Sequence, residues 1–256
     1  MTRSMLCLAT LLLATLLLPA RANAQATTWQ TAVEDSHIGM VHNVLINDDN
    51  QKEKWFRYFP VVERSYCVEV GSGADASGVM TPNYAEAEVW ISASDGTTLI
   101  ASNMYREPYT HRGARACFEA NFTGSLYVKV TDRNSGTFTY RMRMVETTLW
   151  ASWFFIGGDY NSFVLLRNTT NSSVHYTITW RNPAGVQIGQ TSGTVAGNAA
   201  LGINARTVVN NPAVNFNGTV EIGHDGSPQA LVGQVTSLSA STGLGYDATL
   251  FQRQPW

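Results

Sequence analysis

One short segment, His224–Pro228, holds three residue types of a serine-hydrolase triad: His224, Asp225 and Ser227. A triad needs its nucleophile, base and acid on separate supports that align them, and neighbours on one tight turn do not reach that geometry. The sequence also has no G-x-S-x-G elbow, the turn that presents the nucleophile in α/β hydrolases. We therefore interpret the segment as a polar hairpin turn and predict no catalytic residue.

Metal-ligating residue types are spread thinly along the chain. The five histidines form no H-E-x-x-H motif and no Cys/His cluster that would give zinc a tetrahedral set. Oxygen donors in predicted loops, the chemistry that Ca²⁺ prefers, occur at Asp48–Asn50, Asp95 and Asp132. These residues are also ordinary turn formers. We predict no cofactor and no metal ligand, with calcium left open as an alternative.

Aromatic side chains are the candidates for ligand contact, because Trp and Tyr offer large rigid faces with a polar tip. Trp90 lies on the same side of its strand as Glu88 and Ser92, and Tyr127 on the same side as Lys129, an arrangement that would allow both rings to face solvent. Tyr105 and Tyr109 lie in a loop-like stretch. The alternative is that these four rings cover a sheet edge or an interdomain contact.

Two cysteines follow the N-terminal apolar run, and their parity predicts how they pair. If Tyr66 and Val68 face a core, Cys67 faces outward, and Cys117 does the same beside Phe118. Two outward cysteines can bond only from neighbouring strands. We predict a cross-strand disulfide between antiparallel strands, with the pairs Glu69–Arg115 and Ser65–Glu119 beside it. Redox or catalytic thiols are the alternative, but they would want C-x-x-C spacing or a nearby histidine.

Period-two alternation predicts strands throughout the chain. In the first half the core-facing sets are Tyr66/Val68/Val70, Leu126/Val128/Val130 and Phe138/Tyr140/Met142/Met144. In the second half they are Phe163/Leu165, Tyr176/Ile178/Trp180, Val220/Ile222 and Leu231/Val235. Gly- and Pro-containing turns separate the strands, and no 3.6-residue stripe is convincing beyond the N-terminal apolar run. The fold class predicted is all-β, with two β-sandwich domains.

The first 24 residues read as a signal peptide: Arg3, an apolar run from Met5 to Leu18, and Ala22-Asn23-Ala24 as the cleavage site. We predict cleavage near Ala24, domains at residues 25–147 and 148–256, no membrane span and a secreted or cell-surface location. Cleavage leaves 15 basic against 19 acidic residues, a net charge of −4. Such a scattered charge offers no footprint for nucleic acid.

The first half resembles the bacterial pre-peptidase C-terminal domain. The resemblance covers about 100 residues, and it rests on Trp55–Phe59, Arg64–Val70, Val89–Ile91 with Ser94–Gly96, Cys117–Ala120, Gly124–Val130 and Gly136–Tyr140. It implies a jelly-roll-like sandwich with an accessory role; related domains in collagenases bind collagen and calcium. Glu63 departs from the family, which commonly has Gly in that turn. The second half resembles β-sandwich domains of uncharacterised secreted bacterial proteins, and its strand number favours an immunoglobulin-like architecture.

These features together predict a secreted, non-catalytic binding, adhesion or substrate-targeting protein. The expected partner is an extracellular polymer, glycan or protein. One alternative is a structural or assembly subunit of a surface structure, motivated by the Asn/Thr/Gly-rich second half and its sheet edges. A second is a secreted hydrolase of unrecognised type. The sequence leaves the ligand and the oligomeric state open.

Overall fold

The computed structural model describes residues 32–34, 38–39, 41–46, 53–71, 87–92, 95, 98–104, 114–132, 137–209 and 215–253. In this part of the chain there is no α-helix; one 3-10 helix, η2, spans Ala205–Thr207. The prediction of an all-β sandwich fold is confirmed. The predicted signal peptide, Tyr105 and Tyr109 lie outside the described residues. No helix in the described part is long and apolar enough to cross a bilayer.

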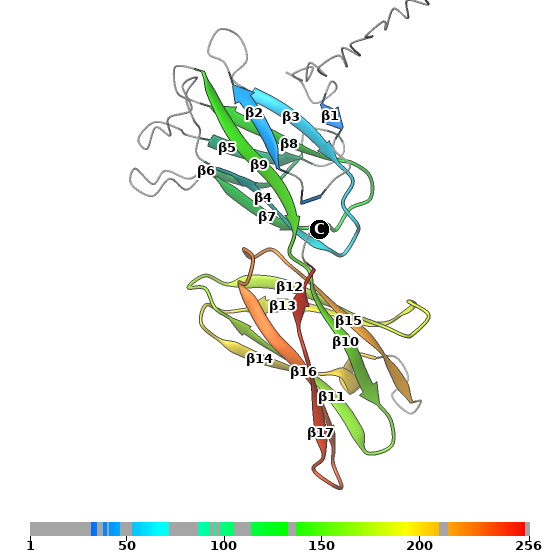
Figure 1. The fold of residues 1–256 in the computed structure, drawn as a ribbon. Coiled ribbons are helices and arrows are strands. Elements are labelled where there is room, and N and C mark those ends of the chain that lie inside the picture. The colour runs from blue at the N-terminus through cyan, green and yellow to red at the C-terminus, as the bar shows by residue number, and fades with distance from the viewer. Residues whose placement is uncertain are drawn as a thin grey trace, which may run out of the picture.

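The N-terminal sandwich packs two sheets against each other (Figure 1). One sheet has the order β1-β3-β8-β5-β6 and the other the order β2-β9-β4-β7. Its strands are β1 (Val33–Glu34), β2 (His42–Ile46), β3 (Glu53–Tyr58), β4 (Ser65–Val70), β5 (Ala87–Ser92), β6 (Leu99–Met104), β7 (Arg115–Glu119), β8 (Leu126–Asp132) and β9 (Phe138–Glu146).

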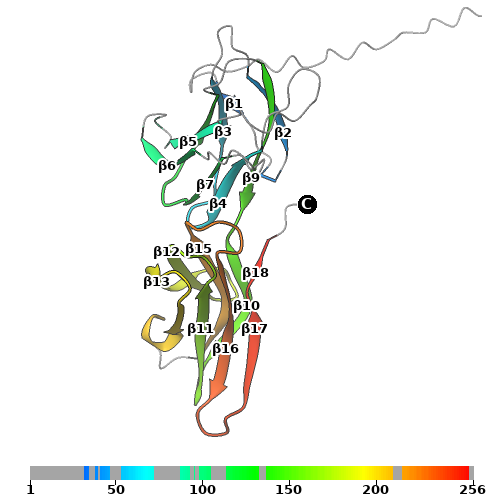
Figure 2. The ribbon, with the colours of Figure 1, turned by 90° about the vertical axis from the view of Figure 1, so that its left-hand side faces the viewer.

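The C-terminal sandwich has sheets of order β13-β12-β15-β10-β18 and β14-β11-β16-β17. Its strands are β10 (Leu149–Ile156), β11 (Tyr160–Asn168), β12 (Val174–Arg181), β13 (Gln187–Val195), β14 (Ala200–Asn204), β15 (Phe216–His224), β16 (Leu231–Ser239), β17 (Gly245–Thr249) and β18 (Phe251–Gln252). The two sandwiches stack end to end, and β9 runs into β10 between them (Figures 1 and 2).

Each sandwich has its own apolar core, built as the alternation predicts. In the first, Val68, Val128 and Met142 are completely buried, and their neighbours Arg141 and Arg143 are exposed. In the second, the fully buried set includes Ile178, Trp180, Val220, Ile222 and Leu231. Burying such side chains contributes roughly 1.5–3 kcal/mol each before the entropy of ordering is subtracted.

Strand β11 corrects one parity prediction. Leu165 is 40% exposed and Phe163 only half-buried, while Val164 and Leu166 face the core. Two polar residues, Ser162 and Asn168, share the buried parity and mislead the sequence pattern. Ser162 bonds to Ser237 and to the backbone of Phe155, and the Asn168 amide donates to the carbonyls of Ser172 and Val195. Satisfied in this way, buried polar groups carry little penalty.

The junction between the sandwiches is tightly packed. Only Thr147 and Thr148 separate β9 from β10, and both are completely buried. The Thr147 amide donates to the Ser65 carbonyl (2.8 Å), and the Ser65 amide donates to Thr148 Oγ1 (3.0 Å). The Arg64 guanidinium lies over the ring of Trp150, 4.8 Å from its centre. The linker is thus part of the packed structure.

Candidate functional site

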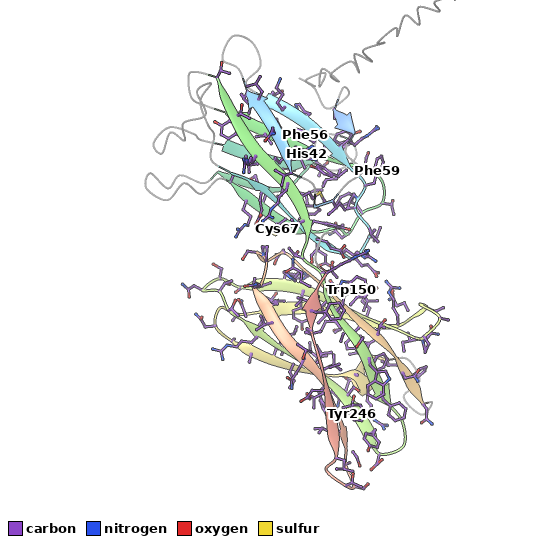
Figure 3. All side chains as sticks on the ribbon, viewed as in Figure 1. His42, Phe56, Phe59, Cys67, Trp150 and Tyr246 are labelled. Atoms are coloured by element: carbon purple, nitrogen blue, oxygen red, sulfur yellow. A yellow bond between two sulfur atoms is a disulfide. The ribbon has the colours of Figure 1, made fainter. Side chains whose placement is uncertain are left out.

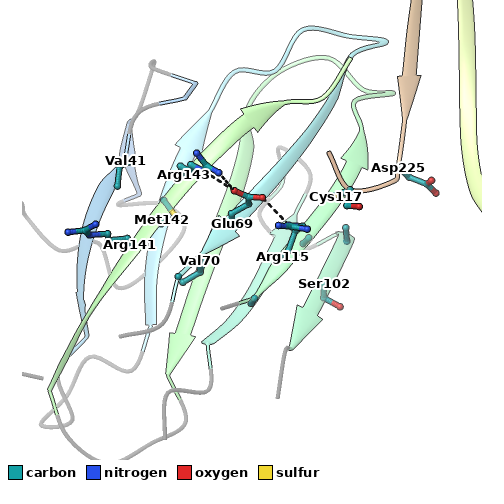
Figure 4. Close-up of a pocket in the computed structure, with 15 residues that line it drawn as sticks. Val41, Glu69, Val70, Ser102, Arg115, Cys117, Arg141, Met142, Arg143 and Asp225 are labelled. Atoms are coloured by element: carbon teal, nitrogen blue, oxygen red, sulfur yellow. Dashed lines mark hydrogen bonds and ion pairs between the residues drawn. The ribbon is translucent and has the colours of Figure 1, made fainter. Parts of the chain in front are cut away.

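A hollow of about 1050 Å³ lies on the outer face of the β2-β9-β4-β7 sheet, beside the junction (Figure 4). Its floor comes from β4, β7 and β9, and one side comes from Ala101 and Ser102 on β6, the edge strand of the other sheet. Its rim includes Asp225 and Ser227, from the connection between β15 and β16 of the other sandwich. Both halves of the chain therefore line it, and ligand sites often form at such domain interfaces.

Three arginines line this hollow, two of them in a cross-strand ladder with one acid. Glu69 on β4 lies opposite Arg115 on β7 and Arg143 on β9. Its carboxylate accepts from Arg115 Nε at 2.9 Å and from Arg143 Nη2 at 2.6 Å. Both arginine side chains are about half exposed, at 50% and 49%. One carboxylate thus serves two guanidinium groups, whose remaining N–H donors are unused by Glu69.

Arg141 is the third cation, two residues from Arg143 on the same face of β9. Its side chain is exposed and has no ion-pair or hydrogen-bond partner in the described part of the chain, and Figure 4 draws no contact from it to the other lining residues. Its backbone carbonyl accepts the amide N–H of Gly71 (2.7 Å), which fixes the strand beneath it. The sheet face of the hollow thus carries three guanidinium groups and one carboxylate.

The predicted disulfide and its register are confirmed. Cys67 and Cys117 are bonded directly across β4 and β7, with Cα atoms 4.1 Å apart. Glu69 pairs with Arg115 and Ser65 with Glu119, as the parity argument requires. Cys67 is nevertheless completely buried, because the Gly226 carbonyl oxygen of the other sandwich lies 3.7 Å from its sulfur.

The segment His224–Pro228 is not a hairpin turn. It connects β15 to β16, which belong to different sheets, and it contacts the first sandwich. His224 is buried and its Nε2 lies 3.0 Å from the Thr147 carbonyl oxygen, while Asp225 accepts the backbone N–H of His175 (2.8 Å). These bonds hold the two side chains to separate partners, so the segment forms part of the junction.

Burial lowers the pKa of His224 to about 4, and the bond to the Thr147 carbonyl acts in the opposite direction. The ring is therefore neutral near pH 7. With Nε2 donating to Thr147, Nδ1 is buried and makes no hydrogen bond of normal geometry in the described residues, while the backbone of Gly226 adds a smaller effect that raises the pKa. Protonation would place a charge in this closed space, so His224 makes the junction sensitive to acid.

Glu63 joins the two sandwiches through its side chain. Its carboxylate accepts from Arg181 Nη2 (3.0 Å) and Gln190 Nε2 (3.0 Å), and Arg181 Nε also donates to Glu221 (2.9 Å). Its backbone has φ 67°, a conformation that glycine adopts more readily. The first sandwich thus keeps a glycine-type turn here while using a side chain that reaches the second.

A second contact lies between Glu119 on β7 and His175 on β12. Glu119 Oε2 and His175 Nδ1 are 3.7 Å apart. Burial raises the pKa of the Glu119 carboxyl, and the side chain of Thr177 and the charge of His175 counteract this. Together with the Glu63 network, this contact fixes the rim of the hollow relative to its floor.

The structure corrects one of the four aromatic candidates. Tyr127 is only 7% exposed and packs with Trp55, so it does not present an open face. The register pairs the Trp90 backbone with Lys129, but its side chain lies outside the described residues, as do Tyr105 and Tyr109. A ligand role for Trp90, Tyr105 and Tyr109 stays a prediction.

A half-exposed aromatic cluster that the sequence analysis did not single out lies far from the junction, around Tyr246 (Figure 3). Trp153 lies 6.1 Å from Phe155 and 4.5 Å from Tyr246, measured between ring centres, and Tyr160 contacts both Phe155 and Tyr246. Tyr246 is 40% exposed. The rings contact one another across β10, β11 and β17 and are not part of the buried core of the second sandwich.

The predicted calcium donors are only partly described. Asp48–Asn50 and the Asp132 side chain lie outside the described residues, and Asp95 accepts bonds from the amide and hydroxyl of Thr98. Among the described residues no group of three or more His, Cys, Asp or Glu side chains is arranged to hold a metal ion. The calcium alternative therefore stays untested.

Comparison with known proteins gives no family for this chain. No family model matches it, and no curated protein does. Similar solved structures include a β-glucuronidase from Bacteroides uniformis, at 9% identity and a TM-score of 0.22, which covers 77% of this chain and 26% of that one. A glycosyl hydrolase family 2 member from Bacteroides cellulosilyticus is 10% identical, with a TM-score of 0.20. The match covers 77% of this chain and 28% of that one.

The chain thus spans about a quarter of the length of these enzymes. At such TM-scores nothing about the activity of this chain follows from them. The alternation of residues in the sequence predicts that Glu69 and Arg115 lie together. Arg141 and Arg143, the other two charged residues on this sheet face, join them only because β9 lies beside β4, which no short-range pattern encodes.

Proposed function

We propose that this chain is a secreted, non-catalytic binding protein that holds an extracellular polymer or surface ligand in the hollow beside the junction. The observation that carries the proposal is the hollow itself: about 1050 Å³, lined from both sandwiches and floored by paired strands. Ligand sites of a few hundred to a thousand Å³ with a few placed polar groups are typical of small-molecule and oligomer recognition.

The chemistry of the described lining favours binding over catalysis. Ser227 lines the hollow without a histidine among the described lining residues, and Cys117 is held in the disulfide. A nucleophile needs an adjacent base within hydrogen-bond reach. The carboxylate oxygens of Glu69 are both engaged by arginines, so they are not free to act on a substrate. The lining instead offers guanidinium hydrogen-bond donors carried on paired strands.

The rigidity of the junction also supports a binding role. A site made from two sandwiches keeps its shape only if the sandwiches keep their relative position. The Glu63–Arg181 pair, the Glu119–His175 contact and the buried Thr147–Thr148 linker all hold that position. A preformed site binds more tightly because less freedom is lost on association.

A filled hollow tests the proposal. Ser102 is exposed on β6 and lines the hollow, so Ser102→Trp narrows it without changing charge; Ser152→Trp, at an exposed position on β10, is the matched control. Both proteins and the wild type are applied, with calcium and with chelator, to arrays of glycans and matrix proteins. We expect saturable wild-type binding that Ser102→Trp weakens at least tenfold and Ser152→Trp leaves unchanged.

Two outcomes would oppose the proposal. Binding that is equal in all three proteins would place the ligand elsewhere, with the Trp153–Tyr246 cluster the next surface to mutate. No binding to any array member, combined with association that increases with protein concentration, would favour the assembly-subunit alternative instead.

A further inference from the structure

From the charges of the hollow we infer that its ligand is an acidic polysaccharide, bound through carboxylate or sulfate groups. This inference rests on the proposed function and adds the chemical class of the ligand. The chain as a whole carries 19 acidic against 17 basic residues. Three arginines on one sheet face are therefore a local concentration of positive charge on an acidic protein.

The balance of charge inside the hollow favours an anion. The described lining carries three guanidinium groups against two carboxylates, Glu69 on the floor and Asp225 at the rim, which leaves an excess of one positive charge. Glu69 is paired with Arg115 and Arg143, and Arg141 has no acidic partner among the described residues. Guanidinium groups keep their charge at all physiological pH values and donate in a planar fork that matches carboxylate and sulfate oxygens. Arg141 offers a complete, unoccupied fork among the described contacts.

The spacing of the ladder suits a ligand with repeated charges. Arg143 and Arg115 lie on β9 and β7, with β4 between them, so their backbones are separated by two strand spacings, roughly 10 Å. Arg141 lies two residues along β9 from Arg143, roughly 7 Å away. Three cations spread over such distances contact several acidic groups of one polymer, where a single small anion reaches only one or two.

The floor favours a polysaccharide over an acidic peptide. An extended peptide gains most of its affinity by adding to a free strand edge. Strand β7, which also lines the hollow, is such an edge, but Glu69, Arg141 and Arg143 stand on β4 and β9, which are internal strands of the sheet. The hollow therefore presents side-chain donors on a sheet face. Small lining residues, Gly71, Ala101 and Ala114, leave room above the backbone for sugar rings that carry their charges on side groups.

Dextran, carboxymethyl-dextran and dextran sulfate provide the test, because they share one backbone and differ in charge. Binding of the mature chain is measured by titration calorimetry. We expect both charged dextrans to bind at least tenfold more tightly than dextran, with an affinity that falls as the NaCl concentration is raised. Comparing carboxymethyl-dextran with dextran sulfate distinguishes recognition of carboxylate from recognition of sulfate.

Variants locate the binding. Arg141→Ala should weaken binding to the charged dextrans about tenfold, the cost of one charge-assisted hydrogen bond, and Arg141→Lys should recover part of it. Glu69→Gln removes the competing carboxylate and should tighten binding. Arg167→Ala, at an exposed arginine on β11 outside the hollow, is the matched control and should change nothing.

Several results would overturn the inference. These are equal binding of neutral and charged dextran, equal affinity of Arg141→Ala and Arg167→Ala, or equally tight binding of poly-L-glutamate. A neutral array ligand that is lost in Ser102→Trp would leave the proposed function in place and refute only the charge class. Loss of all binding, in arrays and titrations alike, would refute both.

Discussion

Glu63 combines an unfavourable backbone conformation with a favourable set of side-chain contacts. A left-handed φ costs a residue with a Cβ about 1 kcal/mol relative to glycine, and Glu63 has φ 67°. Its carboxylate offsets this through Arg181 and Gln190 of the other sandwich. These contacts give a local physical reason for a glutamate, and not a glycine, at this turn.

Two substitutions separate the two effects at Glu63. Glu63→Ala keeps the strained backbone and removes the contacts, so we expect the free energy of unfolding to fall by about 1 kcal/mol, the scale of a partly exposed ion pair. Glu63→Gly relieves the strain and should be more stable than Glu63→Ala by about 1 kcal/mol. Chemical denaturation measures both. Equal stability of the two variants would show that the backbone at this position is not strained.

The lowered pKa of His224 predicts that the protein is less stable to unfolding in acid. Its folded pKa of about 4 lies below the ordinary value of 6.5, so between these values the unfolded chain binds more protons than the folded one. The free energy of unfolding therefore falls as the pH drops from 6.5 to 4, by roughly 3 kcal/mol in total, and does not recover below pH 4. Glu119, with a raised pKa, acts in the opposite direction.

Denaturation at pH 7, 5.5 and 4 tests this prediction. In His224→Gln an amide N–H can replace the imidazole donor to Thr147, and nothing at this position titrates. We expect that variant to lose less stability on acidification than the wild type. Parallel pH profiles for the two proteins would contradict the assignment of the acid sensitivity to His224.

At the scale of strands, the β4–β7 pair shows how far residue parity can be read. Alternating Tyr66, Val68, Ala116 and Phe118 place both cysteines on the outer face, and antiparallel pairing then fixes the whole register. In contrast, β11 buries Ser162 and Asn168 beside Val164 and Leu166. The apolar residues alone therefore predict the wrong buried face for β11. The polar groups that bond to Ser162 and Asn168, and so make their burial tolerable, lie in other segments of the chain.

The disulfide should contribute a large part of the stability of the first sandwich. It joins residues 50 positions apart, and closing a loop of that length contributes about 4 kcal/mol in the chain-entropy model. We expect Cys67→Ala/Cys117→Ala to lower the free energy of unfolding by that order, measured by denaturant titration. Reduction of the wild type should have a similar effect, and a double variant as stable as the oxidised wild type would contradict this account.

At the scale of the whole molecule, the relative position of the sandwiches depends on close backbone contact. A Cβ at Gly223 on β15 would lie 2.6 Å from the Glu63 carbonyl oxygen, closer than atoms pack. Gly223→Ala should therefore force the sandwiches apart at a cost of about 1–3 kcal/mol. Small-angle scattering should show a larger radius of gyration, while Gly202→Ala, whose Cβ meets nothing closer than 3.5 Å, should match the wild type.

The candidate site is a property of this whole-molecule arrangement, which explains why the sequence pattern predicts so little of it. The alternation of Arg141 and Arg143 with Met142 shows that both arginines face outward. It does not show that β9 lies beside β4, or that Asp225 and Ser227 come from the other sandwich to complete the rim. Strand order and domain contact arise from long-range packing, and the hollow depends on both.

Binding by the wild type, Ser102→Trp and Ser152→Trp on one array of glycans and matrix proteins is the most direct measurement of the central claim. If the hollow is the binding site, the wild type and Ser152→Trp bind the same ligand with the same affinity, and Ser102→Trp binds it at least tenfold more weakly. Unchanged binding by a correctly folded Ser102→Trp, or no ligand for any of the three proteins, would contradict the claim.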